Sequence, residues 1–164
     1  MALPLVQFIQ ADQAGIKLEI VQGTTTWEAF PASRHQRKVR DLNRSIRPSP
    51  SIKNLCGCHY LDDVYIRFPD GSIKRPDISM FCDEPPISDE ALDVVPGAVV
   101  EIISKGYEAK DTVIGPEFYL AQGVKDVIVI DPYQNRIHHF TSSGVTVLES
   151  PQTVRLSMGC ELDA

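Results

Sequence analysis

The sequence lacks any apolar run close to the ~20 residues that a membrane-spanning helix needs. Its opening residues also lack a basic segment followed by a long apolar core, which is the pattern of a secretory signal. We therefore expect a cytoplasmic protein with no membrane segment. Internal repeats and linker-like stretches are absent as well, and 164 residues suit one compact core. We expect a single domain over residues 1–164.

Several enzyme motifs are missing too. The chain has no Gly-x-Ser-x-Gly nucleophile motif and no glycine-rich phosphate loop. Basic residues are outnumbered, and the formal net charge of −6 counts against nucleic-acid binding. However, basic residues crowd one segment, 34–47, and an acidic metal site elsewhere would itself lower the total. Net charge therefore does not exclude a nucleic-acid partner.

Cysteine is scarce. The four cysteines are Cys56, Cys58, Cys82 and Cys160. Because cytoplasmic thiols stay reduced, we expect free thiols that pack as small apolar side chains. The run Cys56-Gly57-Cys58-His59 leaves a structural zinc site open as an alternative, although no second paired-ligand motif follows it.

Two early segments have clear periodicity. Residues 16–21 alternate apolar and polar side chains, which predicts a strand with Lys17 and Glu19 on one face. Residues 34–46 carry apolar side chains at helical spacing, with Ser33 as a possible N-cap and Pro48 beyond the end. The rest of this helix is basic. It is either a solvated face or a face that contacts phosphates.

The middle of the chain contains two notable carboxylates. Asp70-Gly71 predicts a hairpin whose return strand, 73–82, contains Asp77 directly after a proline. Residues 98–103 form an apolar run typical of a central strand, interrupted by Glu101. A carboxylate there is costly unless it binds a metal or pairs with a cation such as Arg75. Asp77 and Glu101 on neighbouring strands could share one Mg²⁺ or Mn²⁺.

The remaining pattern predicts a helix ending near Gly123, strands over 124–130, 136–141 and 145–148, and at most one short strand after Pro151. This arrangement indicates a mixed sheet with helices packed on it. The apolar edge strands of the C-terminal meander favour a homodimer.

An ordered set of motifs resembles the Uma-two family of bacterial endonucleases, in the PD-(D/E)XK, or restriction-endonuclease-like, superfamily. The motifs are Arg75-Pro76-Asp77, Val100-Glu101-Ile102-Ile103-Ser104, Asp111, Tyr119, Gly123-Val124 and Asp131-Pro132. Leu18-Glu19, Gly23 and His35 extend the similarity over about residues 15–140.

The resemblance implies an α/β (α+β) fold with a restriction-endonuclease-like α/β/α core and a central mixed β-sheet. It also implies Mg²⁺-dependent hydrolysis of DNA phosphodiester bonds, with metal ligation by Asp77 and Glu101 and a contribution from Glu19. A lysine would orient the attacking water, and the metal would offset charge on the leaving oxygen. The candidates for DNA contact are Arg34, His35, Arg37 and Lys38.

The sequence departs from the family pattern at the catalytic lysine. The superfamily lysine would stand two residues after Glu101, where this chain has Ile103, and the alternative helical position is Gly115. Lys105 and Lys110 are the candidates to replace it. The competing interpretations are a catalytically degenerate nucleic-acid- or protein-binding module on the same fold, and a small-molecule hydrolase with a carboxylate pair.

Overall fold

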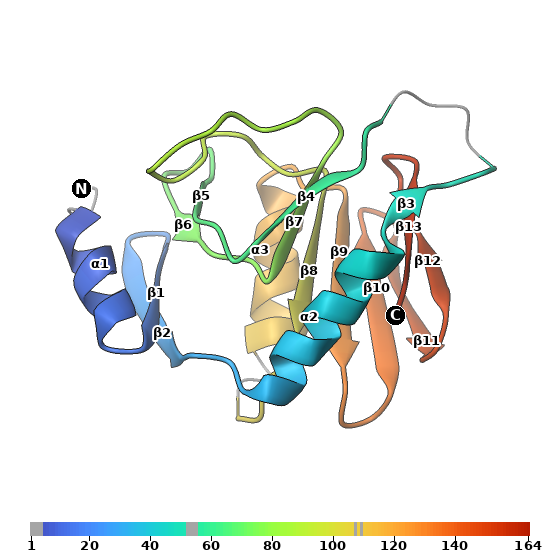
Figure 1. Ribbon diagram of the computed structural model, residues 1–164, viewed down its shortest axis with the longest axis horizontal. Coiled ribbons are helices and arrows are strands. Elements are labelled where there is room, and N and C mark those ends of the chain that lie inside the picture. The colour runs from blue at the N-terminus through green and yellow to red at the C-terminus, as the bar shows by residue number, and fades with distance from the viewer. Residues whose placement is uncertain (1–4, 52–55, 107, 109) are drawn as a thin grey trace.

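The computed structural model describes residues 5–51, 56–106, 108 and 110–164 (Figure 1). The helices and strands are, in chain order, α1 (Leu5–Gln13), β1 (Ile16–Val21), β2 (Thr24–Ala29), α2 (Ser33–Ser45), β3 (Arg47–Pro48), β4 (His59–Asp62), β5 (Ile66–Arg67), β6 (Ile73–Lys74), β7 (Ile78–Phe81), β8 (Ala98–Ile102), the π-helix η1 (Lys110–Ile114), α3 (Gly115–Ala121), β9 (Asp126–Asp131), β10 (Arg136–Thr141), β11 (Gly144–Glu149), β12 (Thr153–Arg155) and β13 (Cys160–Asp163). None of the helices in these residues is long and apolar enough to cross a membrane.

The central sheet has the strand order β11-β10-β9-β8-β7-β4. Strands β8 and β9 are parallel, and η1 and α3 form the crossover that a parallel pair requires. The other neighbouring strands are antiparallel. Every residue of β8 and β9 is buried, as the apolar runs predict. The predicted mixed sheet is confirmed.

Helices cover both faces of this sheet, which gives the predicted three-layer core (Figure 1). Because side chains alternate along a strand, Val100 of β8 faces α2, where it shares a core cluster with Leu42. Its neighbour Val99 belongs to the opposite cluster, with Phe118 of α3. The two carboxylate-bearing segments therefore lie between two helices.

Helix α2 confirms the helix that the periodicity predicted, with bounds of Ser33–Ser45. Its buried face consists of His35, Val39 and Leu42. The predicted Ser33 cap is wrong, because Ser33 is already helical and the N-cap position is Ala32, with no side-chain cap. The basic side chains Arg34 and Arg37 are exposed on the other face.

The predicted return strand over 73–82 is divided between two sheets. The hairpin is confirmed by antiparallel β5 and β6, with Gly71 at φ +85°. However, β6 belongs to a sheet of order β2-β1-β6-β5, whereas β7 belongs to the central sheet. The break falls at Arg75-Pro76-Asp77, where proline cannot donate a ladder hydrogen bond. Asp77 thus lies where the two sheets meet.

The C-terminal tail contains more structure than predicted. Instead of at most one strand, the tail adds two short strands in a separate sheet, in which β13 pairs with β12 on one side and with β3 on the other. Val154 and Leu162 pack into the same cluster as Leu42 of α2. Burial of these side chains against the core stabilises the sheet. A local sequence pattern does not reveal such long-range burial.

The prediction of free thiols is wrong. Cys56 is bonded to Cys82, and Cys58 to Cys160. The bonded residues are 26 and 102 positions apart, so only the fold brings them together. The prediction of free thiols assumed a cytoplasmic location. The location itself stays a prediction.

Candidate active site

The two predicted carboxylates lie side by side. In the antiparallel pair β7–β8, Ile78 lies opposite Val100, which places Asp77 beside Glu101. The main-chain N–H of Asp77 donates to Glu101 Oε2 at 3.3 Å. Asp77 Oδ2 accepts a 2.8 Å hydrogen bond from the N–H of Ile102. Both side chains are buried, so the site begins as two adjacent carboxyl groups withdrawn from bulk water.

Strand β1 brings two further charged groups to this site. Lys17 and Glu19 share one face, as predicted, and both are buried. Lys17 Nζ lies 3.7 Å from Asp77 Oδ1 and 3.2 Å from Glu28 Oε1. An ammonium group therefore stands beside the first carboxylate.

Glu19 has its own partners on β6 and just after it. Strands β1 and β6 are antiparallel with Ile20 opposite Ile73, so Glu19 lies next to Lys74. Glu19 Oε2 is 3.4 Å from Lys74 Nζ, and Oε1 accepts the N–H of Arg75 at 2.8 Å. Lys74 is also buried, and its ammonium lies 5.0 Å from the ring centre of Tyr119.

Opposite charges keep Lys17 and Asp77 ionised. Burial disfavours the charged form of Lys17, but the negative charges of Asp77 and Glu19 outweigh it and raise the pKa of Lys17 well above its ordinary value. Burial likewise opposes ionisation of Asp77, yet Lys17 and His35 lower the pKa of that carboxyl. At neutral pH the site therefore holds a buried ammonium–carboxylate pair.

Each carboxylate is also held by a side chain from a covering helix. His35 of α2 has Nε2 2.9 Å from Asp77 Oδ2. Burial lowers the pKa of His35, but the hydrogen bond and charge of Asp77 raise it further, so the net shift is upward. Tyr119 of α3 donates to Glu101 Oε1 at 2.5 Å. Burial and then the charge of Glu101 raise the pKa of Tyr119 well above its ordinary value, so it remains a donor.

The predicted DNA-contact residues separate into two groups. Arg34 and Arg37 are exposed on α2 and Lys38 is half-buried, whereas His35 is buried against Asp77. The Arg34 guanidinium lies 5.5 Å from the ring centre of Tyr133. His35 therefore faces the carboxylates, and the other three remain near solvent.

The predicted catalytic lysines lie after β8. Lys105 is exposed and helps to line a surface pocket with Arg34, His35 and Tyr133. A neighbouring pocket shares His35 and Ser104 with it and is also lined by Lys17 and Asp77. Lys110 begins η1, and its side chain lies outside the described part of the structure.

The family's two usual lysine positions are occupied by core residues. Ile103 is buried in an apolar cluster with Tyr119 and Val127, and Gly115 is buried at the start of α3. Lys17 and Lys74, which sequence reasoning missed, supply ammonium groups from other strands. The alternation of 16–21 was a usable signal for Lys17, but it did not reveal which face is buried.

The Arg75 guanidinium pairs with two other carboxylates, Asp12 at 2.6 Å and Asp63 at 2.9 Å. Glu101 has Tyr119 and the main chain of Asp77 among its partners.

The donor set fits a hard divalent cation. Among the described residues, the oxygens of Glu19, Asp77 and Glu101 do not all lie within 4.8 Å of one another. Mg²⁺ is usually held by one or two carboxylates and keeps several waters. The adjacent pair Asp77 and Glu101 would supply those carboxylates. Glu19 contacts Lys74 and the N–H of Arg75.

A family described as "Putative restriction endonuclease", Uma2, matches residues 5–163 of this chain. The chain belongs to the Uma2 family. A similar solved structure is that of "a putative nuclease belonging to DUF820" from Anabaena variabilis ATCC 29413. It is 18% identical, with a TM-score of 0.66, and the match covers 87% of this chain and 83% of that one. No curated protein matches the chain.

These comparisons confirm the resemblance and the fold. Membership of Uma2 covers nearly the whole chain and supports a nuclease function in general. At 18% identity the likeness to the Anabaena protein shows the restriction-endonuclease-like fold alone. Proteins of this superfamily generally use a divalent metal, in agreement with the carboxylate pair of this Uma2 member.

Proposed function

We propose that this Uma2 protein is a divalent-metal-dependent endonuclease that hydrolyses DNA phosphodiester bonds at Asp77 and Glu101, with Lys17 as its catalytic lysine. The observation that carries the proposal is the buried Lys17 ammonium, 3.7 Å from Asp77 Oδ1. It supplies the positive charge that Ile103 and Gly115 lack at the usual positions.

Asp77 and Glu101 would hold Mg²⁺ or Mn²⁺, which when bound supplies a Lewis acid that offsets negative charge on phosphate oxygens. Glu19 supports the site by holding Lys74 and the main chain before Asp77. His35 and Tyr119 orient the two metal-binding carboxylates by hydrogen bonds. These contacts fix the carboxylates before substrate arrives, which is the condition for efficient electrostatic catalysis.

The position of Lys17 beside Asp77 defines its role. Its ammonium has N–H groups to donate and lies 3.7 Å from an oxygen of the carboxylate that would hold the metal. Lys17 therefore donates a hydrogen bond to the attacking water or to a phosphate oxygen, and its charge stabilises the negative charge of the transition state.

DNA would approach across the exposed face of α2. Arg34, Arg37 and Lys38 supply phosphate contacts there, and Lys105 lies at the same opening as Arg34. Lys105 is thus a phosphate-contacting candidate in addition to its predicted catalytic role, and Lys110 stays a catalytic candidate from the sequence alone. His35 acts through Asp77, because its ring is buried.

We also propose a homodimer through the edge strand β11. Val145 and Val147 of this strand are about half exposed, at 52% and 51%, and an unpaired edge with apolar side chains favours association. Light scattering after gel filtration would give a dimer for the wild type and a monomer for Val147→Lys. A monomeric wild type at micromolar concentration would contradict this.

The test of the nuclease proposal is cleavage of supercoiled plasmid with Mg²⁺ or Mn²⁺. Wild type is compared with Asp77→Asn and Glu101→Gln, purified identically so that a contaminating nuclease would appear in all three. We expect metal-dependent cleavage that falls at least about 100-fold in both variants. Equal cleavage by all three proteins would refute the assigned site.

The second candidate is a non-catalytic nucleic-acid- or protein-binding module, favoured by Ile103 at the superfamily lysine position. It predicts no cleavage with either metal and no metal binding by calorimetry at Asp77 and Glu101. Retention of a DNA duplex in a gel-shift experiment under those conditions would support the nucleic-acid form of this module.

A further inference from the structure

We propose that the reduced chain binds one Zn²⁺ through the four thiolates of Cys56, Cys58, Cys82 and Cys160. This site is separate from Asp77 and Glu101, and it does not depend on the nuclease proposal. The disulfide-bonded structure would be one of two alternative states of the same four sulfurs.

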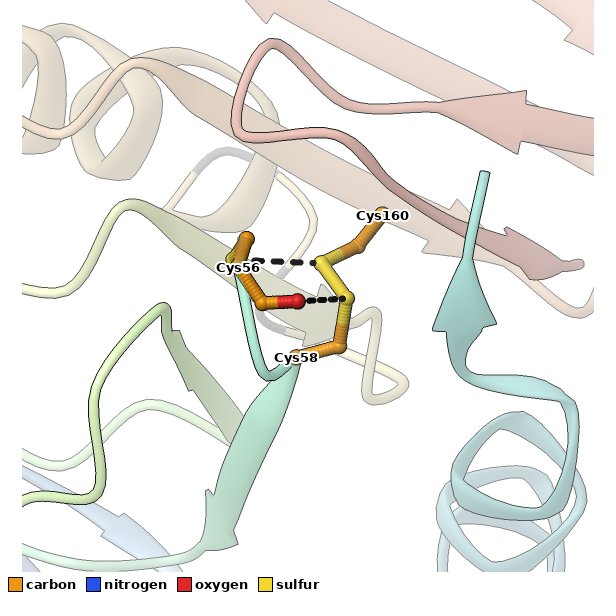
Figure 2. Close-up of side chains that lie close together, drawn as sticks. All are labelled: Cys56, Cys58 and Cys160. Carbon is orange, nitrogen blue, oxygen red and sulfur yellow. Dashed lines mark hydrogen bonds between the residues drawn. A yellow bond between two sulfur atoms is a disulfide. The ribbon is translucent and has the colours of Figure 1, made fainter. Parts of the chain in front are cut away.

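The first argument is the convergence of the sulfurs. Figure 2 shows the side chains of Cys56, Cys58 and Cys160 directed toward one another, and their sulfur atoms all lie within 4.8 Å of one another. Cys56 Sγ is 3.6 Å from Cys160 Sγ, although the two belong to different disulfides. Cys82 adjoins the group because it is bonded to Cys56.

This spacing suits zinc. A Zn–S bond of about 2.3 Å in a tetrahedral site places the sulfurs roughly 3.8 Å apart. The Cys56–Cys160 separation is already close to that value. Zinc binding would require the disulfide partners to separate, and it would require the Cys82 sulfur to approach the group of three. Four cysteine thiolates are also a common ligand set of structural zinc.

The second argument is the tight backbone between the ligands. The N–H of Gly57 donates to the carbonyl oxygen of Cys82 at 2.9 Å, which joins the segment before β4 to the end of β7. A Cβ at position 57 would lie 2.4 Å from His59 Nε2 and 3.0 Å from the Cys82 oxygen. A side chain at position 57 would therefore displace the His59 ring and press on the Cys82 carbonyl, so glycine favours the close approach of the two cysteine-bearing segments.

Burial at the site is uneven. Cys58 and Cys160 are buried, Cys56 is half-buried and Cys82 is exposed. The buried pair would shield the metal from water, and the exposed Cys82 side leaves a path for reductant and for Zn²⁺. Both features suit a structural zinc site that fills after the chain has folded.

The chemistry balances with a dithiol reductant. Each disulfide accepts two electrons and two protons from one dithiol, which leaves as its own disulfide. Reduction of both bonds yields four thiols, and Zn²⁺ binding releases their four protons as thiolates form. Because a sulfur cannot be bonded to both zinc and another cysteine, the two states exclude each other. Either state ties β13 to β7 and to the segment before β4.

The experiment uses the full chain, reduced with a phosphine under argon and freed of metal. Zn²⁺ is titrated against a chromophoric chelator, and Co²⁺ is added in parallel as a spectroscopic probe. The Asp77→Asn/Glu101→Gln variant, which lacks the carboxylate pair, is the background control. We expect one Zn²⁺ per reduced chain in both proteins, a Co²⁺ spectrum typical of tetrahedral thiolate ligation, and neither in the unreduced chain.

Single serine variants of Cys58, Cys82 and Cys160 identify the ligands, and Met158→Leu is the control for a nearby sulfur that is not a thiol. We expect each serine variant to lose more affinity than the ~10–100-fold that loss of an outer-sphere partner costs. Circular dichroism establishes that the variants are folded, and the exposed Cys82 is the position least needed for packing. Absence of zinc binding by the reduced wild type, or unchanged affinity in Cys82→Ser, overturns the four-thiolate site.

Discussion

At the scale of single residues, Lys17 is the side chain on which the proposed catalysis depends. We predict that Lys17→Gln lowers the rate of metal-dependent plasmid cleavage about 100-fold, because it removes a fixed positive charge beside Asp77. Affinity for Mn²⁺, measured by calorimetry, should change far less, since both carboxylates remain.

Two lysines provide controls for this variant. Lys105→Gln tests the predicted catalytic role of an exposed lysine at the pocket opening, and we expect a smaller loss of rate. Lys125→Gln changes an exposed lysine between α3 and β9 and should leave cleavage unchanged. If Lys105→Gln abolished cleavage and Lys17→Gln did not, the catalytic lysine would be Lys105.

The pair of His35 and Asp77 predicts a pH-dependent contribution to stability. The pKa of His35 is raised above its ordinary 6.5, because the bond to Asp77 outweighs burial. The stabilisation is therefore fully present below about pH 6.5 and is lost as pH rises through the folded-state pKa. Urea unfolding at about pH 5.5 and pH 8.5 measures the unfolding free energy of both proteins. The value for wild type should exceed that for His35→Gln by more at the lower pH.

His138→Gln is the control for that comparison, because the ring of His138 stacks against Phe140 of the same strand. If the difference in unfolding free energy between wild type and His35→Gln stays constant or grows toward pH 8.5, the predicted stabilisation by the His35–Asp77 interaction is wrong. The contribution of Asp77 to stability depends on pH in the opposite direction. Its lowered pKa gives stability that is present above about pH 4 and is lost as pH falls through the folded-state value.

At the scale of elements, α2 combines two roles on its two faces. The buried face contributes His35 to the site, and the exposed face carries the basic side chains. We predict that Arg37→Gln weakens DNA binding and lowers the slope of log affinity against log salt by about 1. The measurement is fluorescence anisotropy of a labelled duplex in the absence of divalent metal. Lys125→Gln should leave the slope unchanged, and an equal decrease there would assign the effect to overall charge.

The two disulfides join the same region but close loops of different length. We predict that Cys58→Ser/Cys160→Ser lowers the unfolding free energy of the oxidised, zinc-free protein by about 4–5 kcal/mol. The matched pair Cys56→Ser/Cys82→Ser should cost roughly 1 kcal/mol less, because its loop spans 26 positions instead of 102. Urea unfolding with a chelator present measures both, and a larger loss for the shorter loop would contradict the loop-entropy explanation.

At the scale of the whole molecule, the site couples metal binding to stability. A cation that binds only the folded chain adds about 2.7 kcal/mol at 100 times its Kd. For a domain of this size that corresponds to a rise in Tm of about 5–10 °C. We predict this rise with Mn²⁺ for the wild type and its absence for Asp77→Asn/Glu101→Gln. A similar rise in that variant would place the binding site elsewhere.

The site also joins parts of the molecule that are far apart in the chain. Lys17 comes from β1 of the four-stranded sheet, Asp77 from the break between β6 and β7, and Glu101 from the central sheet. Helices α2 and α3 add one hydrogen-bonding side chain each. Loosening of the four-stranded sheet would therefore remove Lys17 from the carboxylates without unfolding the core.

The features that could be predicted from the sequence are local ones. The apolar runs over β8 and β9, the alternation over β1 and the helical spacing of α2 depend on near neighbours, so their periods could be read directly. Glu101 and Asp77 could be identified because a carboxylate inside an apolar strand, or just after a proline beside one, needs a compensating partner.

The pairing of distant segments, and the choice of which strand face is buried, depend on the tertiary structure. The face of Lys17 and Glu19 is buried because β1 pairs with β6 beside Asp77, and that pairing spans more than fifty residues. The division of 73–82 between two sheets, the sheet that contains β13 and the joining of Cys58 to Cys160 likewise depend on contacts remote in sequence. Such contacts form because the whole chain must bury its apolar surface at once, and no local period records which distant segment will cover which face.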